Sequence, residues 1–319
     1  MLFGLIVIRA ERAPGKVAAC SVGGIEKGEE IDDRTAQELE KAGHRYLPVE
    51  DGGGLGEVEA CEILAQALAG DGVSFEVSDE GRAVFSAARR GFYTVWREGV
   101  EALIRTGLFT FASIAQPAHV ERGDILAVLE ALQPSYVREE LLELTTSARG
   151  ALRTAEYKRL RLCVILVAKG GYDLDSMEEA VVDSIRRYGC EVCGVHATAP
   201  DAESVTKAIN TCLNGCDGAV VAGGLSNKPG DYVTEVVACK YRIALYGFPM
   251  KPTANAILAY DGDDKPLICV PSRIAAFRRD NALDLLLPIA ATEVDPDVVI
   301  TTWNGGLKKG WIEARHGGR

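Results

Sequence analysis

The strongest constraint on the fold is an alternation of apolar runs and helix-length segments in the second half of this 319-residue chain. Residues 162–168 (LCVILVA) are continuously apolar, as expected of a strand buried on both faces of a sheet. Strands that alternate with helices of this length predict right-handed βαβ units and a parallel sheet. The later segments expected are helix 175–188, strand 191–197, helix 201–213, strand 218–222 and a helix from 231 to about 240.

The stretch that follows predicts further strands and one long helix. Residues 243–246, 256–260 and 267–270 have the composition of strands, and the last two flank a turn sequence at 261–264 (DGDD), which indicates a hairpin. Residues 272–287 are expected to form one helix, with Pro288 near its end.

The first half of the chain has a different pattern, of short strands with a few helices. A polar and basic segment at 148–161 (ARGALRTAEYKRLR) is typical of a domain boundary. We therefore expect a β-rich α+β accessory region over residues 1–150 and an α/β domain over 151–319.

Charge and hydropathy exclude some classes of partner. The formal net charge of -11 argues against a general nucleic-acid surface or an anionic membrane surface. The apolar run at the start is too short to span a bilayer, and it lacks the basic leader of a signal peptide. We expect a soluble, cytoplasmic protein without a nucleic-acid or membrane partner.

The nine cysteines are scattered, which in a chain without a secretion signal favours reduced thiols used as small core residues. Cys190 and Cys193 lie three apart in an expected strand and so point to opposite faces. Cys212 and Cys216 flank an expected helix end and do not complete a familiar zinc pattern. No metal site is predicted, and His196 is interpreted as a core or edge histidine.

The candidate ligand site is the stretch 218–234 (GAVVAGGLSNKPGDYVT), an apolar strand that runs into a glycine-rich turn. Open α/β folds bind ligands at the carboxyl ends of their strands. Gly223 and Gly224 allow close approach of backbone to a ligand, while Ser226 and Asp231 supply oxygen atoms. A plain turn followed by a helix cap is the alternative interpretation.

Three ordered segments carry a resemblance to a known family. They are GGLSNKPGDYV (223–233), YGFPMKPTANAILAYDGDDKPLICVPS (246–272) and an apolar helix that ends at a proline. Together they resemble the molybdopterin-binding domain of molybdopterin molybdenumtransferases, gephyrin-like proteins and stand-alone molybdopterin-binding proteins, over residues 160–289. The segment KGEEIDDRTAQELEKAGHRYLPV is similar to the N-terminal motif pattern of the stand-alone members.

The resemblance implies a three-layer α/β/α domain with a mostly parallel sheet, and a site for a pterin that carries a dithiolene and a phosphate. It assigns catalytic positions to Ser226 and Asp231 and a place in the signature turn to Gly223 and Gly224. It implies molybdopterin as the ligand, molybdate and Mg²⁺ in members that insert metal, and a homo-oligomer. The other positions implied to contact the ligand are Lys251, Pro252, Pro271, Ser272, Arg273 and Asp201.

Departures from the family pattern leave the activity open. The family carries an acidic residue after its first strand, where this chain has Lys169-Gly170-Gly171-Tyr172, and its Gly-Asn-Pro is replaced by Ser272-Arg273-Ile274. Mg²⁺ needs carboxylate and phosphate oxygens together, so the missing acid at Gly171 favours binding over turnover. The alternatives are therefore a molybdenumtransferase, a non-catalytic pterin carrier or regulatory protein, and a nucleotide-binding enzyme on the same scaffold.

Overall fold

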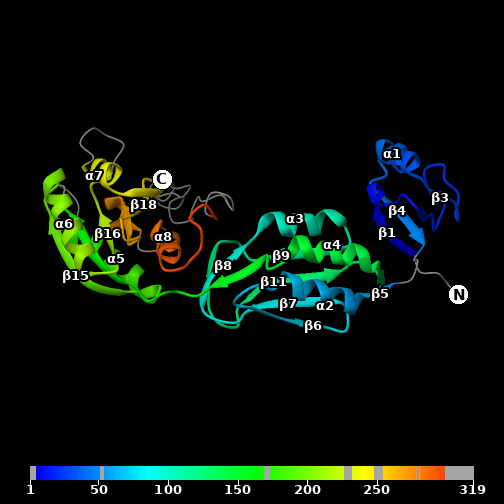
Figure 1. The fold of residues 1–319 in the computed structure, drawn as a ribbon, viewed down its shortest axis with the longest axis horizontal. Helices are drawn as coiled ribbons and strands as arrows, with labels where there is room; N and C mark the ends of the chain where they lie inside the picture. Colours follow the sequence, from blue (N-terminus) through cyan, green and yellow to red (C-terminus); the bar gives the residue numbers. More distant parts are fainter. Residues whose placement is uncertain are drawn as a thin grey trace, which may run out of the picture. The chain divides into compact units, whose positions relative to one another are not determined.

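The protein has a mixed α/β fold with two compact units (Figure 1). This computed structural model describes residues 5–50, 54–168, 173–225, 232–247, 254–277, 279 and 281–298. The first unit comprises residues 1–116 and 120–154, and the second comprises residues 117–119 and 155–319. Within the described residues, no helix has the length and apolar character needed to cross a membrane.

The first unit combines short antiparallel strands with helices. Its largest sheet has the order β6-β7-β11-β9, and β1 pairs with β4 in a separate ribbon. Its first α-helix begins at a side-chain cap, because the carboxylate of Asp32 accepts a hydrogen bond from the Thr35 amide at 2.7 Å. The strands up to residue 155 are β1 (Leu5–Arg9), β2 (Lys16–Val17), β3 (Glu30–Ile31), β4 (Tyr46–Glu50), β5 (Leu55–Gly56), β6 (Val73–Val77), β7 (Arg82–Ala87), β8 (Gly91–Val95), β9 (Phe109–Ser113), β10 (Ala118–Val120), β11 (Ile125–Ala131), β12 (Ser135–Tyr136) and β13 (Leu152–Ala155). The helices are η1 (Ala10–Arg12), α1 (Asp33–Lys41), α2 (Glu57–Leu68), α3 (Arg97–Thr106) and α4 (Arg138–Ala148).

The second unit is built on a six-stranded sheet with the order β15-β14-β16-β19-β18-β17. The first four strands in this order run parallel, and β18 and β17 add to the edge in antiparallel fashion. The predicted hairpin at 261–264 is confirmed, because it joins β18 to β19. The strands are β14 (Arg161–Val167), β15 (Glu191–Thr198), β16 (Gly218–Ala222), β17 (Arg242–Tyr246), β18 (Ile257–Tyr260) and β19 (Pro266–Val270).

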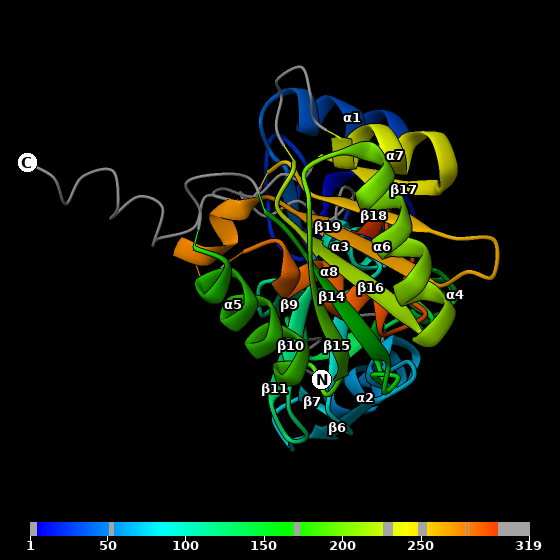
Figure 2. The ribbon, with the colours of Figure 1, turned by 90° about the vertical axis from the view of Figure 1, so that its left-hand side faces the viewer.

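Helices cover this sheet because its central strands are apolar on both faces. Every residue of β16 and β19 is buried, so each strand needs a partner above and below. One buried cluster joins alternate residues of these strands to α6 and α7, while α5 and α8 contact β14 and β19 and lie on the other side in Figure 2. The helices are α5 (Leu174–Arg187), α6 (Ala202–Gly215), α7 (Tyr232–Lys240), η2 (Ser272–Ala276) and α8 (Leu283–Ala290).

The single helix expected over 272–287 is wrong, because the chain forms two separate elements there. A short 3₁₀ segment, η2, is followed by α8, and Pro288 lies inside α8 rather than after it. Asn281 explains the break: its buried side chain donates to the carbonyl of Phe277 at 2.9 Å and accepts from the amide of Leu283 at 2.8 Å. An Asn that bonds its neighbouring backbone in this way competes with a continuous helix and starts a new one.

Candidate binding edge of the central sheet

The glycine turn lies at the carboxyl end of β16, as predicted for the second unit. The amide of Gly223 donates to the carbonyl of Val270 at 2.9 Å, so the turn is tied to the neighbouring strand β19. Gly223 and Gly224 have φ angles of +97° and +68°, in the left-handed region that disfavours residues with a side chain.

The turn also leaves no room for a side chain at either glycine. A Cβ at Gly223 would lie 3.0 Å from the carbonyl oxygen of Val167, and a Cβ at Gly224 would lie 2.6 Å from Cγ2 of Val233. The turn is therefore held between the end of β14 and the start of α7. Both glycines are required by the local geometry, which leaves their main-chain groups at the end of the sheet.

The register of the sheet brings a second predicted segment to the same edge. Ala222 of β16 pairs with Val270 of β19, so the residues that follow each strand are neighbours. Pro271 is buried, Ser272 is half-buried, and Arg273 is exposed on η2. Of the predicted site residues, Gly223 and Gly224 thus lie beside Pro271, Ser272 and Arg273 at this carboxyl edge.

Asp201 lies at the same edge, beyond β15, where its carboxylate caps a helix. It accepts a hydrogen bond from the amide of Ser204 at 2.8 Å at the start of α6. These hydrogen bonds lower the pKa of Asp201 below its ordinary value. The strand order places β14 between β15 and β16, so Asp201 follows a strand two places from the glycine turn, roughly 10 Å away in the plane of the sheet.

The remaining predicted site residues lie outside the described part of the chain. They are Ser226, Asp231, Lys251 and Pro252, together with Gly171, where the family acid is missing. Their roles stay predictions.

The connections after β14 and β16 go to opposite faces of the sheet. β14 continues into α5, and β16 continues into α7, which shares a buried cluster with α6. Figure 2 shows α5 and α7 on opposite sides of these two neighbouring strands. Such a reversal is the point at which open α/β sheets place their ligands, in the crevice between the two diverging loops. Gly223 and Gly224 belong to one of those loops.

A cavity of about 580 Å³ lies elsewhere, between α6 and α7. Its lining includes Glu203, Lys207, Asn210 and Lys240 and none of the predicted site residues. It therefore does not coincide with the carboxyl edge.

The expectation of reduced, separate thiols is wrong for four of the cysteines. Cys163 is bonded to Cys212, and Cys193 is bonded to Cys216. Contacts between β14, β15 and α6 bring together residues that are 49 and 23 positions apart in the chain. The four-residue spacing of Cys212 and Cys216 was the available signal, because it puts two cysteines at one helix end, where Cys216 directly follows α6.

Several solved structures are similar to this chain. They include proteins of molybdenum- and tungsten-cofactor synthesis. The tungsten cofactor synthesizing protein MoaB from Pyrococcus furiosus is 18% identical, with 37% of this chain and 88% of that chain covered and a TM-score of 0.32. The molybdopterin biosynthesis MoeA protein from Pyrococcus horikosii is 12% identical, with coverage of 90% and 75% and a TM-score of 0.29. The protein CinA of unknown function from Thermoplasma acidophilum is 16% identical, with coverage of 36% and 89% and a TM-score of 0.32.

No family model and no curated protein matches the chain.

Proposed function

We propose that the second unit binds a phosphorylated pterin of the molybdopterin class at the carboxyl edge of its sheet, in molybdenum cofactor biosynthesis or handling. The observation that carries this proposal is the turn at Gly223 and Gly224, which ends a fully buried strand and excludes any side chain. Such a turn presents main-chain groups instead of side chains, and because the Gly223 amide already donates to Val270, the donors proposed for the ligand are the amides that follow it. Phosphate groups are commonly bound by amides arranged in this way.

The residues beside the turn fit the same ligand. Ser272 offers a hydroxyl group that can donate or accept, and exposed Arg273 offers a planar fork that can bind two phosphate oxygens. Helices on both faces of the sheet agree with the three-layer arrangement that the sequence resemblance implies. In this proposal Ser226, Asp231, Lys251 and Pro252 complete the pocket, as the sequence motifs indicate.

We favour binding without metal insertion over a molybdenumtransferase. Insertion with Mg²⁺ needs carboxylate oxygens close to the ligand, and the sequence has Gly171 at the position of the family acid. The described carboxylates that follow β15 and β14 are both engaged at helix starts: Asp201 accepts from the Ser204 amide, and Asp173 accepts from the Asp175 amide and the Ser176 hydroxyl. A carrier or regulatory protein is the form of the function that these residues support.

The proposal is tested by titrating the full chain with molybdopterin and, separately, with ATP, and following pterin fluorescence. We expect saturable pterin binding that ATP does not displace. Arg273→Ala should weaken binding about tenfold, as expected for the loss of one charged hydrogen-bonding group. Arg186→Ala, at an exposed arginine in the last turn of α5, is the matched control and should bind as the wild type does.

Absence of saturable pterin binding would reject the proposal. Displacement of the pterin by ATP would reject it in favour of a nucleotide site. A molybdate-insertion assay with and without Mg²⁺ then separates carrier from transferase. Product formation that depends on Mg²⁺ would show that the missing acid is replaced by another group.

A further inference from the structure

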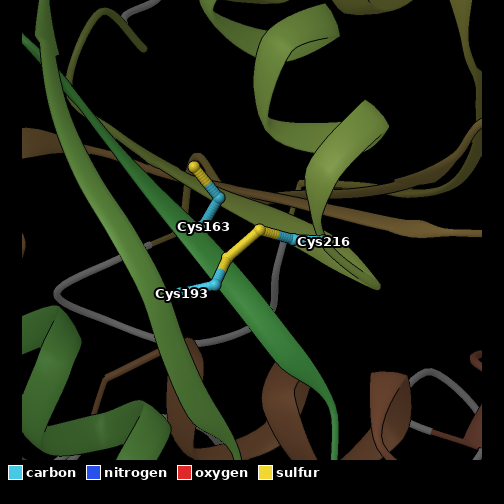
Figure 3. Close-up of side chains that lie close together, drawn as sticks. All are labelled: Cys163, Cys193 and Cys216. Carbon is cyan, nitrogen blue, oxygen red and sulfur yellow. A yellow bond between two sulfur atoms is a disulfide. The ribbon is translucent and has the colours of Figure 1, made fainter.

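Four cysteines and one histidine gather in the second unit, where the C-terminal end of α6 packs against β14 and β15. The sulfur atoms of Cys163, Cys193 and Cys216 lie within 4.8 Å of one another (Figure 3). The sulfur atoms of Cys163 and Cys212 also lie within 4.8 Å of a ring nitrogen of His196. Cys163 belongs to both groups, so these five residues form one sulfur cluster.

Local structure explains why residues so far apart in sequence meet here. The register between β14 and β15 shifts after Leu162, so that Cys193 has no partner of its own and Gly194 pairs with Cys163. A bulge of this kind redirects the side chain of the extra residue. His196 pairs with Ile165, whose side chain faces α6, and this places the imidazole on the same face as Cys163.

Gly194 makes room for the histidine. A Cβ at this position would lie 3.2 Å from Nε2 of His196. The imidazole of His196 therefore lies over Gly194, the residue of β15 that pairs with Cys163. A larger residue in place of Gly194 would crowd the ring.

The chemistry of these side chains is that of a thiophilic metal site. Zinc sites with four protein ligands use Cys₄ or Cys₃His sets with Zn–S distances of about 2.3 Å, so neighbouring sulfur atoms lie about 3.8 Å apart. The three sulfur atoms lie within 4.8 Å of one another, and the bonded pair Cys193 and Cys216 must separate by about 2 Å after reduction to reach that geometry. Thiolate ligands select Zn²⁺ and other soft ions over Mg²⁺ or Ca²⁺.

We propose that, when both disulfides are reduced, the sulfur cluster binds one Zn²⁺ through Cys163, Cys193 and Cys216, with Cys212 or His196 as the fourth ligand. Disulfide formation and zinc binding use the same sulfur atoms and exclude each other. With a phosphine reductant, each disulfide and one water molecule give two thiols and the phosphine oxide. Zinc then binds the thiolates and releases their protons to solvent.

This site is separate from the proposed pterin edge. Cys163 lies four residues before Val167, which ends β14, a separation of roughly 13 Å along the strand. The cluster therefore lies toward the amino ends of the parallel strands and links α6 to the edge strand β15. Its ligands come only from protein, as in structural zinc sites, so the proposal does not depend on pterin binding.

The test uses the full chain, reduced with a phosphine under argon, loaded with Zn²⁺ and freed of excess metal by gel filtration. We expect one zinc per chain by mass spectrometry. Replacement by Co²⁺ should give the visible absorption bands of tetrahedral thiolate coordination, a readout that needs no variant. Retention of no metal by the reduced wild-type chain, or octahedral cobalt spectra, would overturn the proposal.

Variants identify the ligands. Cys193→Ser and Cys216→Ser should each raise the dissociation constant for zinc at least 100-fold, whereas Cys239→Ser, at an exposed cysteine outside the disulfides, should leave it unchanged. Cys212→Ser and His196→Ala then identify the fourth ligand, since only one of them should lower the affinity strongly. Equal zinc affinity in wild type, Cys193→Ser and Cys216→Ser would overturn the assignment, and circular dichroism verifies that each variant is folded.

Discussion

The two ends of the central sheet in the second unit are built by different means. At the carboxyl edge, Gly223 and Gly224 have no side chains, and the geometry is fixed by backbone conformation and close packing. Toward the amino ends, Cys163, Cys193 and Cys216 bring reactive side chains together across three elements. One end is therefore fixed by its main chain, which suits the pterin site that we propose there, whereas the other end is held together by its own side chains.

The largest expected change in the free energy of unfolding comes from a substitution at the carboxyl edge. Gly224→Ala should lower the free energy of unfolding by about 2–4 kcal/mol. Alanine would have to keep the left-handed backbone conformation of Gly224, and its Cβ would be forced against Val233. Gly262→Ala is the matched control, since a Cβ at Gly262 meets no atom within 4 Å. Urea unfolding of both variants measures the difference, and equal midpoints would mean that the turn is not constrained as described.

The next largest change in stability is expected from zinc binding at the sulfur cluster, toward the amino ends of the strands. Zinc at a free concentration of 100 times its dissociation constant should stabilise the reduced chain by about 2.7 kcal/mol. Thermal unfolding of the reduced protein, with and without zinc, measures this, and at the same zinc concentration Cys216→Ser should reduce the stabilisation to about 0.4 kcal/mol or less. A zinc-dependent shift of the same size in that variant would place the metal elsewhere.

A smaller effect is expected at the start of α8, where side chains again fix the structure. The hydroxyl group of Tyr188 donates to the carboxylate of Asp284 at 2.9 Å, and Arg187 pairs with the same carboxylate at 2.8 Å. Tyr188→Phe should cost about 1–2 kcal/mol, as expected for loss of a hydrogen bond to a charged group. Urea unfolding at neutral pH checks this, and Tyr46→Phe, at an exposed tyrosine of the first unit, should have no comparable effect.

The same tyrosine predicts a pH dependence. Burial, followed by the negative charge of Asp284, raises the pKa of Tyr188 above its ordinary value of 10.0. A raised pKa means that the folded chain holds the proton more tightly, so the stabilisation is complete below pH 10 and is lost as the pH rises further. Unfolding measured on both sides of pH 10 should show a smaller alkaline loss in Tyr188→Phe than in the wild type. An unchanged alkaline loss would contradict this assignment.

The smallest expected effect is at Asp201. Asn caps helices as well as Asp does, so Asp201→Asn should keep α6 intact and change pterin affinity by less than about threefold. A larger loss of affinity, measured by pterin fluorescence, would show that the carboxylate contacts the ligand directly. Because hydrogen bonding lowers the pKa of Asp201, its contribution to stability is present above pH 3.8 and is lost as the pH falls below it.

Periodicity predicted most of the second unit, because its strands are long apolar runs and its helices carry clear caps. It failed where local side chains override the pattern, as Asn281 does by dividing an apolar stretch into η2 and α8. The glycine turn was predicted because two adjacent glycines after an apolar strand indicate a turn with positive φ angles. The sulfur cluster was not predicted, because it depends on a bulge at Cys193 and on the register of β14 with β15, and the spacing of Cys212 and Cys216 alone reveals neither.

The central claim, that a pterin binds at the carboxyl edge, is tested most directly by amide hydrogen exchange with and without molybdopterin. We predict that the ligand slows exchange at Gly224, Leu225 and Ser272, while the amides of Cys212 and Cys216 toward the amino ends of the sheet exchange as before. Protection confined to the cavity between α6 and α7, or unchanged exchange at all of these amides under saturating ligand, would contradict the account.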